Sequence, residues 1–514
     1  MNIISFSLPY HHSHEQFLSQ LQENGLTGLS PYFMVKKSLD ARKKKDIRWV
    51  YSVSLSDPRL LLKRDFPNIG VSSVKPVIIG SGPAGLFTAY WLLQYNVPSI
   101  ILEQGAPIGE RTRKIASFIR HGILDEKTNI CYGAGGAGAW SDGKLFTRTK
   151  SPFAAHVRDI LIRFGALEEI RFLSNPHLGS DRIRQVVSNM LHYLEEKGVE
   201  VCFHTQVLDF HVKDKKILGV ITNQGKMETD TIFLATGHSS RTIYDCLQSH
   251  QALEFKPFAM GLRMVHPASL ISRIQYGRDD FPLPATYRLA HTWKKPVRRG
   301  VYTFCMCPGG YVLNSSTDPH GIVCNGMSNY SKNSRFSNSA IVVNIESDDL
   351  QGNAVLKGLE FQKNTEERFA GLANSKGSVH ALPAMRLVDF LKQRPSSRVP
   401  LSGCLHPIKP GSLYECFPDF MNEALINGLE IFNRKMKGLI HPDAVLIGAE
   451  TRTSSPFRVM RDPVTFQSLL LSGLYPLGEG AGYAGGIVSS AVDGINGAEA
   501  YIRAIQKKSG GFSH

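Results

Sequence analysis

Residues 76–105, PVIIGSGPAGLFTAYWLLQYNVPSIILEQG, contain a short apolar strand, a glycine-rich turn, a helical stretch and a second apolar strand, in that order. The turn is GSGPAG, residues 80–85, and the second strand ends at Glu103. Residues 76–102 carry no charge, but their glycines and prolines divide them into elements too short to span a membrane. The segment therefore predicts a buried βαβ unit.

The glycines of this turn have separate tasks in a dinucleotide-binding unit. Gly80 makes the tight turn, Gly82 lets the backbone approach a pyrophosphate, and Gly85 allows the helix to pack closely on the strand. The helix N-terminus presents free N–H groups and a partial positive charge to the phosphates. Glu103 stands where a carboxylate can bond both hydroxyls of an adenosine ribose. Strand, turn, helix, strand and acid together predict a site for either FAD or NAD.

Two later segments favour FAD over NAD. Residues 231–237, TIFLATG, and residues 473–484, GLYPLGEGAGYA, each predict an apolar strand that ends in glycine-containing turns. Glu479 in the second turn can place its carboxylate near a ribityl chain. Gly485 and Gly486 then open a helix whose N-terminus would face the flavin ring, where a helix dipole stabilises the negative charge of reduced flavin. We therefore predict non-covalently bound FAD.

These segments, together with CYGAGGAGAWSDGKLFTR, FCMCPGG and ETRTSSPFR, resemble the uncharacterised FAD-dependent (NAD(FAD)-utilising) dehydrogenase family over nearly the whole chain. That family is similar to glutathione-reductase-type flavoproteins in its FAD-binding fold. The resemblance implies that the glycine-rich loop around Gly136 packs its backbone on the flavin or the pyrophosphate. Two positions depart from the pattern: Glu479 stands where the wider flavoproteins usually have Asp, and Met385 stands where the family favours Gln.

The predicted fold class is α/β, with a three-layer, Rossmann-like FAD-binding domain that a mixed-sheet substrate domain interrupts. Residues 1–70 predict a small α+β N-terminal domain. Residues 71–255 form the first part of the FAD-binding domain, residues 256–465 the substrate or cap domain, and residues 466–514 the closing part of the FAD-binding domain. This division follows from the position of the flavin-type segments at both ends of a middle region rich in strands and turns.

The candidate cofactor-binding residues lie at the ends of these strands and in the glycine-rich loops. They are Gly80, Gly82, Pro83, Ala84, Gly85, Glu103, Gln104, Arg111, Gly135, Gly136, Gly138, Val207, Ala235, Thr236, Gly237, Gly478, Glu479, Gly485, Gly486 and Ile487. Arg111 follows Glu103 closely and is assigned to a phosphate, with a surface position as the alternative. Arg452, Ser455 and Arg458 form the candidate substrate group, because arginines beside a hydroxyl suit an anionic substrate; a structural crossover is the alternative.

Cysteine and histidine spacing offers little further chemistry. The eight cysteines show no zinc-type spacing, so we expect reduced thiols, and the scattered histidines predict no metal site. Cys305 and Cys307, in FCMCPGG, would share one face of a strand, either as a redox pair beside the flavin or as two buried thiols. The second interpretation is favoured because a CxC pair lacks the helix N-terminus that activates CxxC thiols.

Composition and charge set the remaining expectations. Of 514 residues, 42% are hydrophobic and 20% are charged, which excludes general disorder. The formal charge is +15, and residues 36–48, KKSLDARKKKDIR, form a basic run that is more typical of a solvated surface than of a nucleic-acid site. No signal peptide or stable membrane insertion is predicted, and we expect a cytoplasmic protein.

The sequence as a whole predicts an FAD-dependent oxidoreductase, a dehydrogenase that transfers a hydride between an unidentified small-molecule substrate and FAD. The substrate is expected to be anionic, and NAD(P)H or a protein is expected to serve as electron partner. One alternative is a flavin-containing nucleic-acid-binding or RNA-modifying protein that uses residues 1–70. Another is a flavin-binding regulatory protein without turnover.

Overall fold

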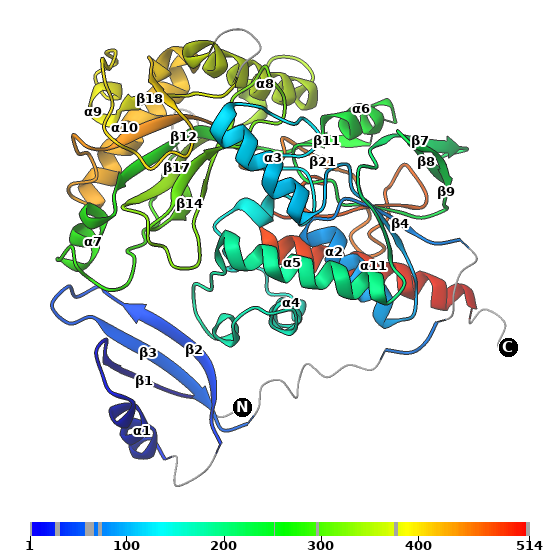
Figure 1. The fold of residues 1–514 in the computed structure, drawn as a ribbon, viewed down its shortest axis with the longest axis horizontal. Coiled ribbons are helices and arrows are strands. Elements are labelled where there is room, and N and C mark those ends of the chain that lie inside the picture. Colours follow the sequence, from blue (N-terminus) through cyan, green and yellow to red (C-terminus); the bar gives the residue numbers. More distant parts are fainter. Residues whose placement is uncertain are drawn as a thin grey trace.

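The βαβ unit predicted at residues 76–105 is present in the computed structural model as β4 (Val77–Ile79), α2 (Pro83–Gln94) and β5 (Ile100–Leu102) (Figure 1). All three residues of β4 are buried, as expected for a parallel strand that is covered on both faces. The structure describes residues 3–25, 31–56, 66–69, 74–250, 252–294, 298–374 and 379–509.

β4 is the central strand of a five-stranded parallel sheet with the order β22-β10-β4-β5-β6. β6 is Glu200–Cys202, β10 is Ile232–Leu234 and β22 is Leu474–Pro476. β22 comes from the far end of the sequence and pairs with β10 along its whole length. The C-terminal segment therefore completes a sheet that the first half of the chain begins.

Two further layers cover this parallel sheet. On one face lie α2, α5 (Gly179–Glu196) and α11 (Ile487–Ser509), which run side by side in Figure 1. On the other face an antiparallel sheet of β7 (Val207–Lys213), β8 (Lys216–Thr222) and β9 (Gly225–Glu228) packs against β4 and β10 through a shared apolar core. Helices, parallel sheet and antiparallel sheet form three layers.

A seven-stranded mixed sheet forms the second large body, in the order β13-β14-β17-β12-β20-β18-β19. Only β18 and β19 pair in parallel. Its strands are β12 (Phe258–Pro267), β13 (Ala290–Trp293), β14 (Arg299–Cys307), β17 (Phe336–Ile345), β18 (Leu382–Arg386), β19 (Ile408–Pro410) and β20 (Val445–Glu450).

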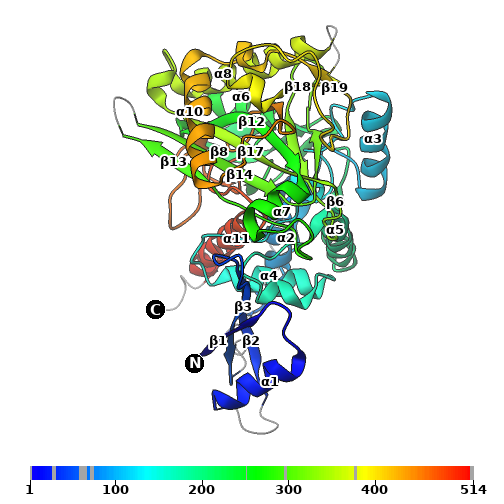
Figure 2. The ribbon, with the colours of Figure 1, turned by 90° about the vertical axis from the view of Figure 1, so that its left-hand side faces the viewer.

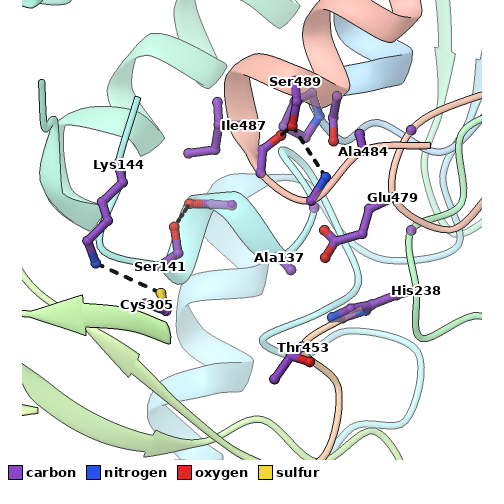
Figure 3. Close-up of a pocket in the computed structure, with 18 of the residues that line it drawn as sticks. Ala137, Ser141, Lys144, His238, Cys305, Thr453, Glu479, Ala484, Ile487 and Ser489 are labelled. Carbon is purple, nitrogen blue, oxygen red and sulfur yellow. Dashed lines mark hydrogen bonds between the residues drawn. The ribbon is translucent and has the colours of Figure 1, made fainter. Parts of the chain in front are cut away.

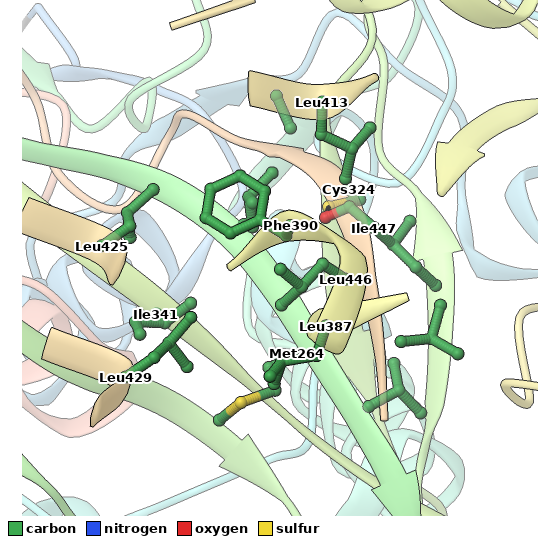
Figure 4. Packing of buried hydrophobic residues seen from close by; sticks show 14 of the residues in the cluster. Met264, Cys324, Ile341, Leu387, Phe390, Leu413, Leu425, Leu429, Leu446 and Ile447 are labelled. Atoms are coloured by element: carbon green, nitrogen blue, oxygen red, sulfur yellow. Dashed lines mark hydrogen bonds between the residues drawn. The ribbon is translucent and has the colours of Figure 1, made fainter. Parts of the chain in front are cut away.

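Figure 4 shows the core of this second body, where side chains from strands and helices interdigitate. One buried cluster contains Met264 of β12, Leu446 of β20, Phe390 of α9 (Leu387–Phe390), and Leu425 and Leu429 of α10 (Asp419–Lys435). All of these side chains are fully buried. The sheet is therefore held rigidly, which suits it to form one wall of a binding site.

A small N-terminal unit stands apart from the main body in both views (Figures 1 and 2). It contains β1 (Ile3–Pro9), α1 (His14–Glu23), β2 (Phe33–Asp40) and β3 (Arg48–Ser54), with the antiparallel order β1-β3-β2. Lys37 joins it to the main body, because its N–H donates to the carbonyl of Phe172 at 2.8 Å and its carbonyl accepts from Ser174 at 3.0 Å.

The chain crosses between the two large bodies at a pair of antiparallel strands, β11 (Leu253–Phe255) and β21 (Phe457–Val459). The remaining elements are α3 (Ile108–His121), α4 (Phe153–Arg163), α6 (Arg241–Ser249), α7 (Ala268–Tyr276), β15 (Tyr311–Asn314), β16 (Cys324–Met327), α8 (Ala354–Ala373) and short 3-10 turns at Ala137–Trp140, Glu168–Arg171, Ser347–Asp349 and Leu413–Cys416. Within the described ranges, no helix combines the length and the apolar character needed to cross a bilayer.

Candidate functional site

One large cavity lies where the carboxyl ends of the parallel strands face the seven-stranded sheet, with a volume of about 1410 Å³. Ligand pockets commonly span roughly 300–1,000 Å³, so this cavity has room for a dinucleotide and a second small molecule. Its walls come from the turn after β4, the end of β5, the loop at residues 136–149, the end of β10, strand β14 and the start of α11. Figure 3 shows side chains from several of these segments converging on the same space.

The turn after β4 has the shape that a diphosphate requires. Gly80 has φ +104, and a Cβ there would lie 2.5 Å from the carbonyl oxygen of Ala235, so only glycine fits. A Cβ at Gly85 would lie 1.9 Å from the Gly80 oxygen, which is the close helix–strand packing that the sequence predicted. A Cβ at Gly82 would meet no heavy atom nearer than the Cα of Gly136, at 3.8 Å.

The space in front of Gly82 is therefore a cradle between two glycine backbones. Gly82 is the N-cap of α2, and no side chain caps the helix, so the N–H groups of its first turn are available to a ligand. Pro83 and Ala84 line the cavity beside it, as do Gly136 and Gly138 on the opposite loop. The arrangement fits the diphosphate of a dinucleotide.

Glu103 lines the cavity, but its carboxylate is fully engaged by the protein. One oxygen accepts from the N–H and the hydroxyl of Ser81 at 3.0 and 2.7 Å, and the other accepts from the N–H groups of Gly105 and Gly133 at 2.9 and 3.0 Å. A carboxylate offers about four acceptor sites, so these bonds use all of them. The predicted bond to ribose hydroxyls would compete with these four donors. Gln104, next along the chain, also lines the cavity.

Arg111 does not contact a phosphate site, contrary to prediction. It is fully buried in α3, and its guanidinium donates to the carbonyl oxygens of Asn129, Ile130, Gly133 and Ala134 at 2.6–3.0 Å. Burial lowers the pKa of Arg111 to about 9. The loop at residues 129–134 directs four carbonyl oxygens at the guanidinium group of Arg111. Arg111 therefore holds this glycine-rich loop in place.

Gly135 also lies away from the cavity that its neighbours line. A Cβ at Gly135 would meet the side chain of Val187 in α5 at 3.0 Å, on the helical side of the loop. The loop reverses direction at Gly133, Gly135 and Gly136, which all have positive φ. That reversal turns Gly135 to the helices and leaves Gly136 and Gly138 on the cavity.

The second group of predicted residues also lines the cavity: Val207, Ala235, Thr236, Gly237, Gly478, Glu479, Gly485, Gly486 and Ile487. α11 begins at Ile487, directly at the cavity wall, so its N-terminal dipole points into this space. Ser489 accepts a hydrogen bond from the N–H of Gly485 at 3.3 Å and donates to the Gly486 carbonyl at 3.1 Å, which braces the glycine pair (Figure 3).

Glu479 points into the cavity in Figure 3. Burial raises the pKa of the Glu479 carboxyl to about 7, and the ammonium group of Lys256 moderates this rise. Lys256 lies on the cavity wall as well. The carboxyl is therefore poised between its neutral and ionised forms near neutral pH.

His238 is a site residue that the sequence motifs do not predict; it follows Gly237 at the end of the β10 segment and faces the cavity (Figure 3). Burial lowers the pKa of the His238 imidazole to about 4, and the charge of Arg452 acts in the same direction. The imidazole is neutral at pH 7, and its Nδ1 is hydrogen-bonded to the hydroxyl of Ser239 at 3.0 Å. Its position directly after Ala-Thr-Gly is the signal that could have identified it.

The predicted substrate group, Arg452, Ser455 and Arg458, is not brought together. Arg452 lines the cavity, but its three nitrogens donate to Thr317 at 2.8 Å and to the two carboxylate oxygens of Glu366 at 3.0 and 2.8 Å. Ser455 is buried away from the cavity, and Arg458 donates to Glu254 at 3.0 Å on the surface. The crossover at residues 450–458 twists these side chains to different sides, and Arg452 is committed to a buried ion pair.

Lys144 and Asp142 complete the cavity wall near β14, and neither is among the residues predicted from the sequence. Lys144 Nζ lies 3.1 Å from the Asp142 carboxylate, 3.9 Å from Cys305 Sγ and 3.8 Å from Cys307 Sγ. All eight cysteines are free thiols in the structure. Within the ranges that the structure describes, no group of His, Cys, Asp or Glu has the geometry of a metal site.

Comparisons with known proteins link the chain to FAD-dependent proteins. Residues 257–453 match a family described as "FAD-dependent protein, C-terminal domain-like". An uncharacterised protein of Clostridium beijerinckii is 38% identical over 495 residues, which cover 91% of this chain and 92% of the relative. A D-amino acid dehydrogenase of Helicobacter pylori is 32% identical over 80 residues, which cover 16% of this chain and 20% of that enzyme.

Alignments with solved structures are weaker. The flavin-dependent brominase Bmp2 aligns over 84% of this chain and 79% of its own, with 11% identity and a TM-score of 0.37. CtdE in complex with FAD aligns over 85% of this chain and 88% of its own, with 11% identity and a TM-score of 0.31.

Proposed function

We propose that this chain, which belongs to the same family as the uncharacterised C. beijerinckii protein and has FAD as its cofactor, is an oxidoreductase that transfers a hydride between a small-molecule substrate and non-covalently bound FAD. The observation that carries the proposal is the continuity of the cavity. One space runs from the diphosphate cradle at Gly82 to the face of the seven-stranded sheet at β14. A flavin at the end of α11 would therefore share its space with a second ligand.

The residues at the two ends of the cavity have distinct tasks in this proposal. The N–H groups that follow Gly82 bind the diphosphate, and the backbone of Gly136 and Gly138 closes over it. The start of α11, at Gly485 to Ile487, directs its positive end toward the flavin ring. FAD supplies the hydride chemistry when bound, and the protein orients the reacting partners and excludes water.

Two side chains on the wall are placed to hold a proton. Glu479, with a pKa of about 7, can hold or release one near neutral pH, and we assign it to the ribityl side of the cofactor. His238 is neutral and accepts or donates hydrogen bonds without adding charge. We assign His238 to the substrate side, because Thr453 beside it comes from the crossover that leads out of the seven-stranded sheet.

The cavity wall carries more positive than negative charge. Among the described residues that line it are six cationic side chains, Lys144, Arg148, Lys256, Arg288, Lys332 and Arg452, and four carboxyl groups, Glu103, Asp142, Glu450 and Glu479. Such a wall attracts anions, including the diphosphate of FAD. We therefore propose an anionic substrate. The electron partner in this proposal is NAD(P)H or another protein.

An anaerobic screen tests the function. Holoprotein is mixed with small carboxylates and other metabolite anions, and with NADH and NADPH, while the visible absorbance of the flavin is followed. We expect an anionic compound to bleach the flavin and an added acceptor to restore it. A flavin that dithionite reduces but that no class of metabolite or nicotinamide reduces would argue against turnover and favour a regulatory flavoprotein.

A further inference from the structure

Cys305 and Cys307 lie at an irregularity in the seven-stranded sheet. Along the pairing of β14 with β17, Phe304 is opposite Ala340 but Cys307 is opposite Asn338, so β14 holds one extra residue at this point. Cys305 has φ +46, a left-handed conformation that is uncommon outside glycine and costs strain. The bulge places Cys305 on the cavity wall and leaves Cys307 fully buried behind it.

The two sulfurs share one cation. Lys144 Nζ donates to Cys305 Sγ at 3.9 Å, as Figure 3 shows, and to Cys307 Sγ at 3.8 Å, so both thiols lie within reach of the same ammonium group. Asp142 holds the ammonium group at 3.1 Å. The buried guanidinium of Arg263 lies behind the pair and donates to the Cys305 carbonyl oxygen at 3.0 Å.

This environment favours a thiolate at Cys305. The neighbouring Cys307 side chain lowers the pKa of the Cys305 thiol, and the charges of Lys144 and Arg263 lower it further, against the effect of burial. The Cys307 thiol itself donates to the Cys305 carbonyl oxygen at 3.3 Å. The other buried cysteines differ. Burial raises the pKa of Cys416 to about 12, and burial together with the charge of Glu450 raises the pKa of Cys324 well above its usual value. Thiolates are the reactive form of cysteine, so Cys305 is set apart chemically from these two.

We propose that Cys305 and Cys307 form a redox-active dithiol that exchanges an electron pair with bound FAD. The proposal rests on the proposed function, because it places the pair in the same cavity as the flavin. The charge of Cys305 also acts on Glu479 across that cavity. In the direction that reduces the flavin, the Cys305 thiolate and the Cys307 thiol become a disulfide. The S–H bond of Cys307 breaks, one S–S bond forms, and FAD takes up the electron pair and the single proton, becoming anionic reduced flavin.

The structure also assigns unequal roles to the two sulfurs. Cys305 faces the cavity and carries the negative charge, so it is the sulfur that reacts first. Cys307 is shielded from the cavity and completes the disulfide. Lys144 acts as a positioning residue, since it holds both sulfurs together and stabilises the thiolate.

The dithiol proposal is tested by measuring both the electrons that the holoprotein takes up and the number of its free thiols. Air-oxidised holoprotein is titrated anaerobically with dithionite, and samples are quenched, denatured and alkylated for mass spectrometry. We expect about four electrons per FAD, because a disulfide and a flavin each take an electron pair. Two of the eight thiols should be protected in the oxidised sample, in a linked peptide that contains Cys305 and Cys307.

Matched variants give the control. Cys305→Ser and Cys307→Ser should each lower the uptake to about two electrons per FAD, whereas Cys246→Ser, in α6, should leave about four. Retained flavin absorbance shows that each variant is folded. Eight alkylated thiols and about two electrons per FAD in the unaltered protein would overturn the dithiol and leave the oxidoreductase proposal standing. If the unaltered protein bound no FAD, the proposed function itself would be refuted.

A second measurement does not depend on turnover. The rate of iodoacetamide alkylation at Cys305 is followed against pH in reduced holoprotein by mass spectrometry. Lys144→Met should move the midpoint of this profile to higher pH, and the alkylation rate well below the midpoint should fall about tenfold for every pH unit by which the midpoint rises. Lys256→Met removes a different cavity cation and should leave the Cys305 profile in place. An unchanged profile in Lys144→Met would contradict the role of Lys144.

Discussion

Replacing Gly82 by Val should remove FAD and leave the apoprotein folded. The backbone at Gly82, with φ −74 and ψ −176, is open to any residue, and a Cβ there meets no heavy atom nearer than 3.8 Å. The cost to folding is that of a poorer N-cap, about 1 kcal/mol. The side chain instead occupies the cradle where the diphosphate meets the N–H groups of α2.

The loss of FAD affinity can be estimated from the contacts that the side chain would block. Hydrogen bonds to a charged group contribute about 1.5–3 kcal/mol each, so losing two weakens FAD binding by about 3–6 kcal/mol. That corresponds to a roughly 10²- to 10⁴-fold increase in Kd. The assays are flavin content after purification, FAD titration of the apoprotein, and thermal unfolding of the apoprotein.

Gly85→Ala is the matched contrast, three residues further along the same turn. Its Cβ would lie 1.9 Å from the Gly80 oxygen and 3.2 Å from a methyl group of Ile78, so strand and helix must separate. We expect a loss of about 1–3 kcal/mol or more in the stability of the apoprotein itself. Gly82→Val protein with full flavin content and an unchanged Kd would refute the assignment of the cradle to the diphosphate.

Three further changes address the cavity wall. A Cβ at Gly486 would have its nearest atom 3.9 Å away, so Gly486→Ala should fold, and it should shift the flavin midpoint potential negative by about 20 mV for each kcal/mol of dipole stabilisation lost. Glu479→Ala should mainly weaken FAD retention. Spectroelectrochemistry measures the potential and a flavin-release assay measures retention; the reverse pattern would exchange the roles of the two residues. Folding raises the pKa of Glu479, so its neutral form stabilises the apoprotein at low pH, and this stabilisation is lost as the pH rises from about 4 through about 7. Urea unfolding at a series of pH values should show this loss of stability, and the stability of Glu479→Gln should not fall in that range for this reason. Arg452→Met leaves the buried Glu366 carboxylate with Arg241, at 3.5 Å, as its remaining ion-pair partner and should cost up to about 3–5 kcal/mol in urea unfolding, with recovery when Glu366→Leu is added. An unaffected stability would restore Arg452 as a free substrate ligand.

The dinucleotide unit could be predicted from the sequence because its contacts are local. Gly85 packs on Gly80 and Ile78 within the same unit, and the positive φ of Gly80 belongs to the turn itself. The carbonyl oxygen that excludes a Cβ at Gly80 comes from Ala235, at the end of β10, and is the one distant contact among these. The C-terminal strand and helix were equally visible, since the apolar stretch at residues 474–476 and the glycines before Ile487 carry their own pattern. FAD followed from these two segments together.

The sequence by itself therefore determined the dinucleotide turn, the flavin-type C-terminal segment and the cofactor. Only the tertiary structure decided where single charged side chains point: Arg111 was expected at a phosphate but is enclosed by carbonyls, and Arg452 is paired with a glutamate 86 positions earlier. Cys305 lies at a one-residue bulge and meets Lys144 from a loop 161 positions earlier, and no spacing rule foresees either the bulge or the contact. Spacing along the chain predicts contacts within a turn or a strand pair, whereas ion pairs and thiol environments depend on how distant segments pack, because burial and a partner's charge arise only there.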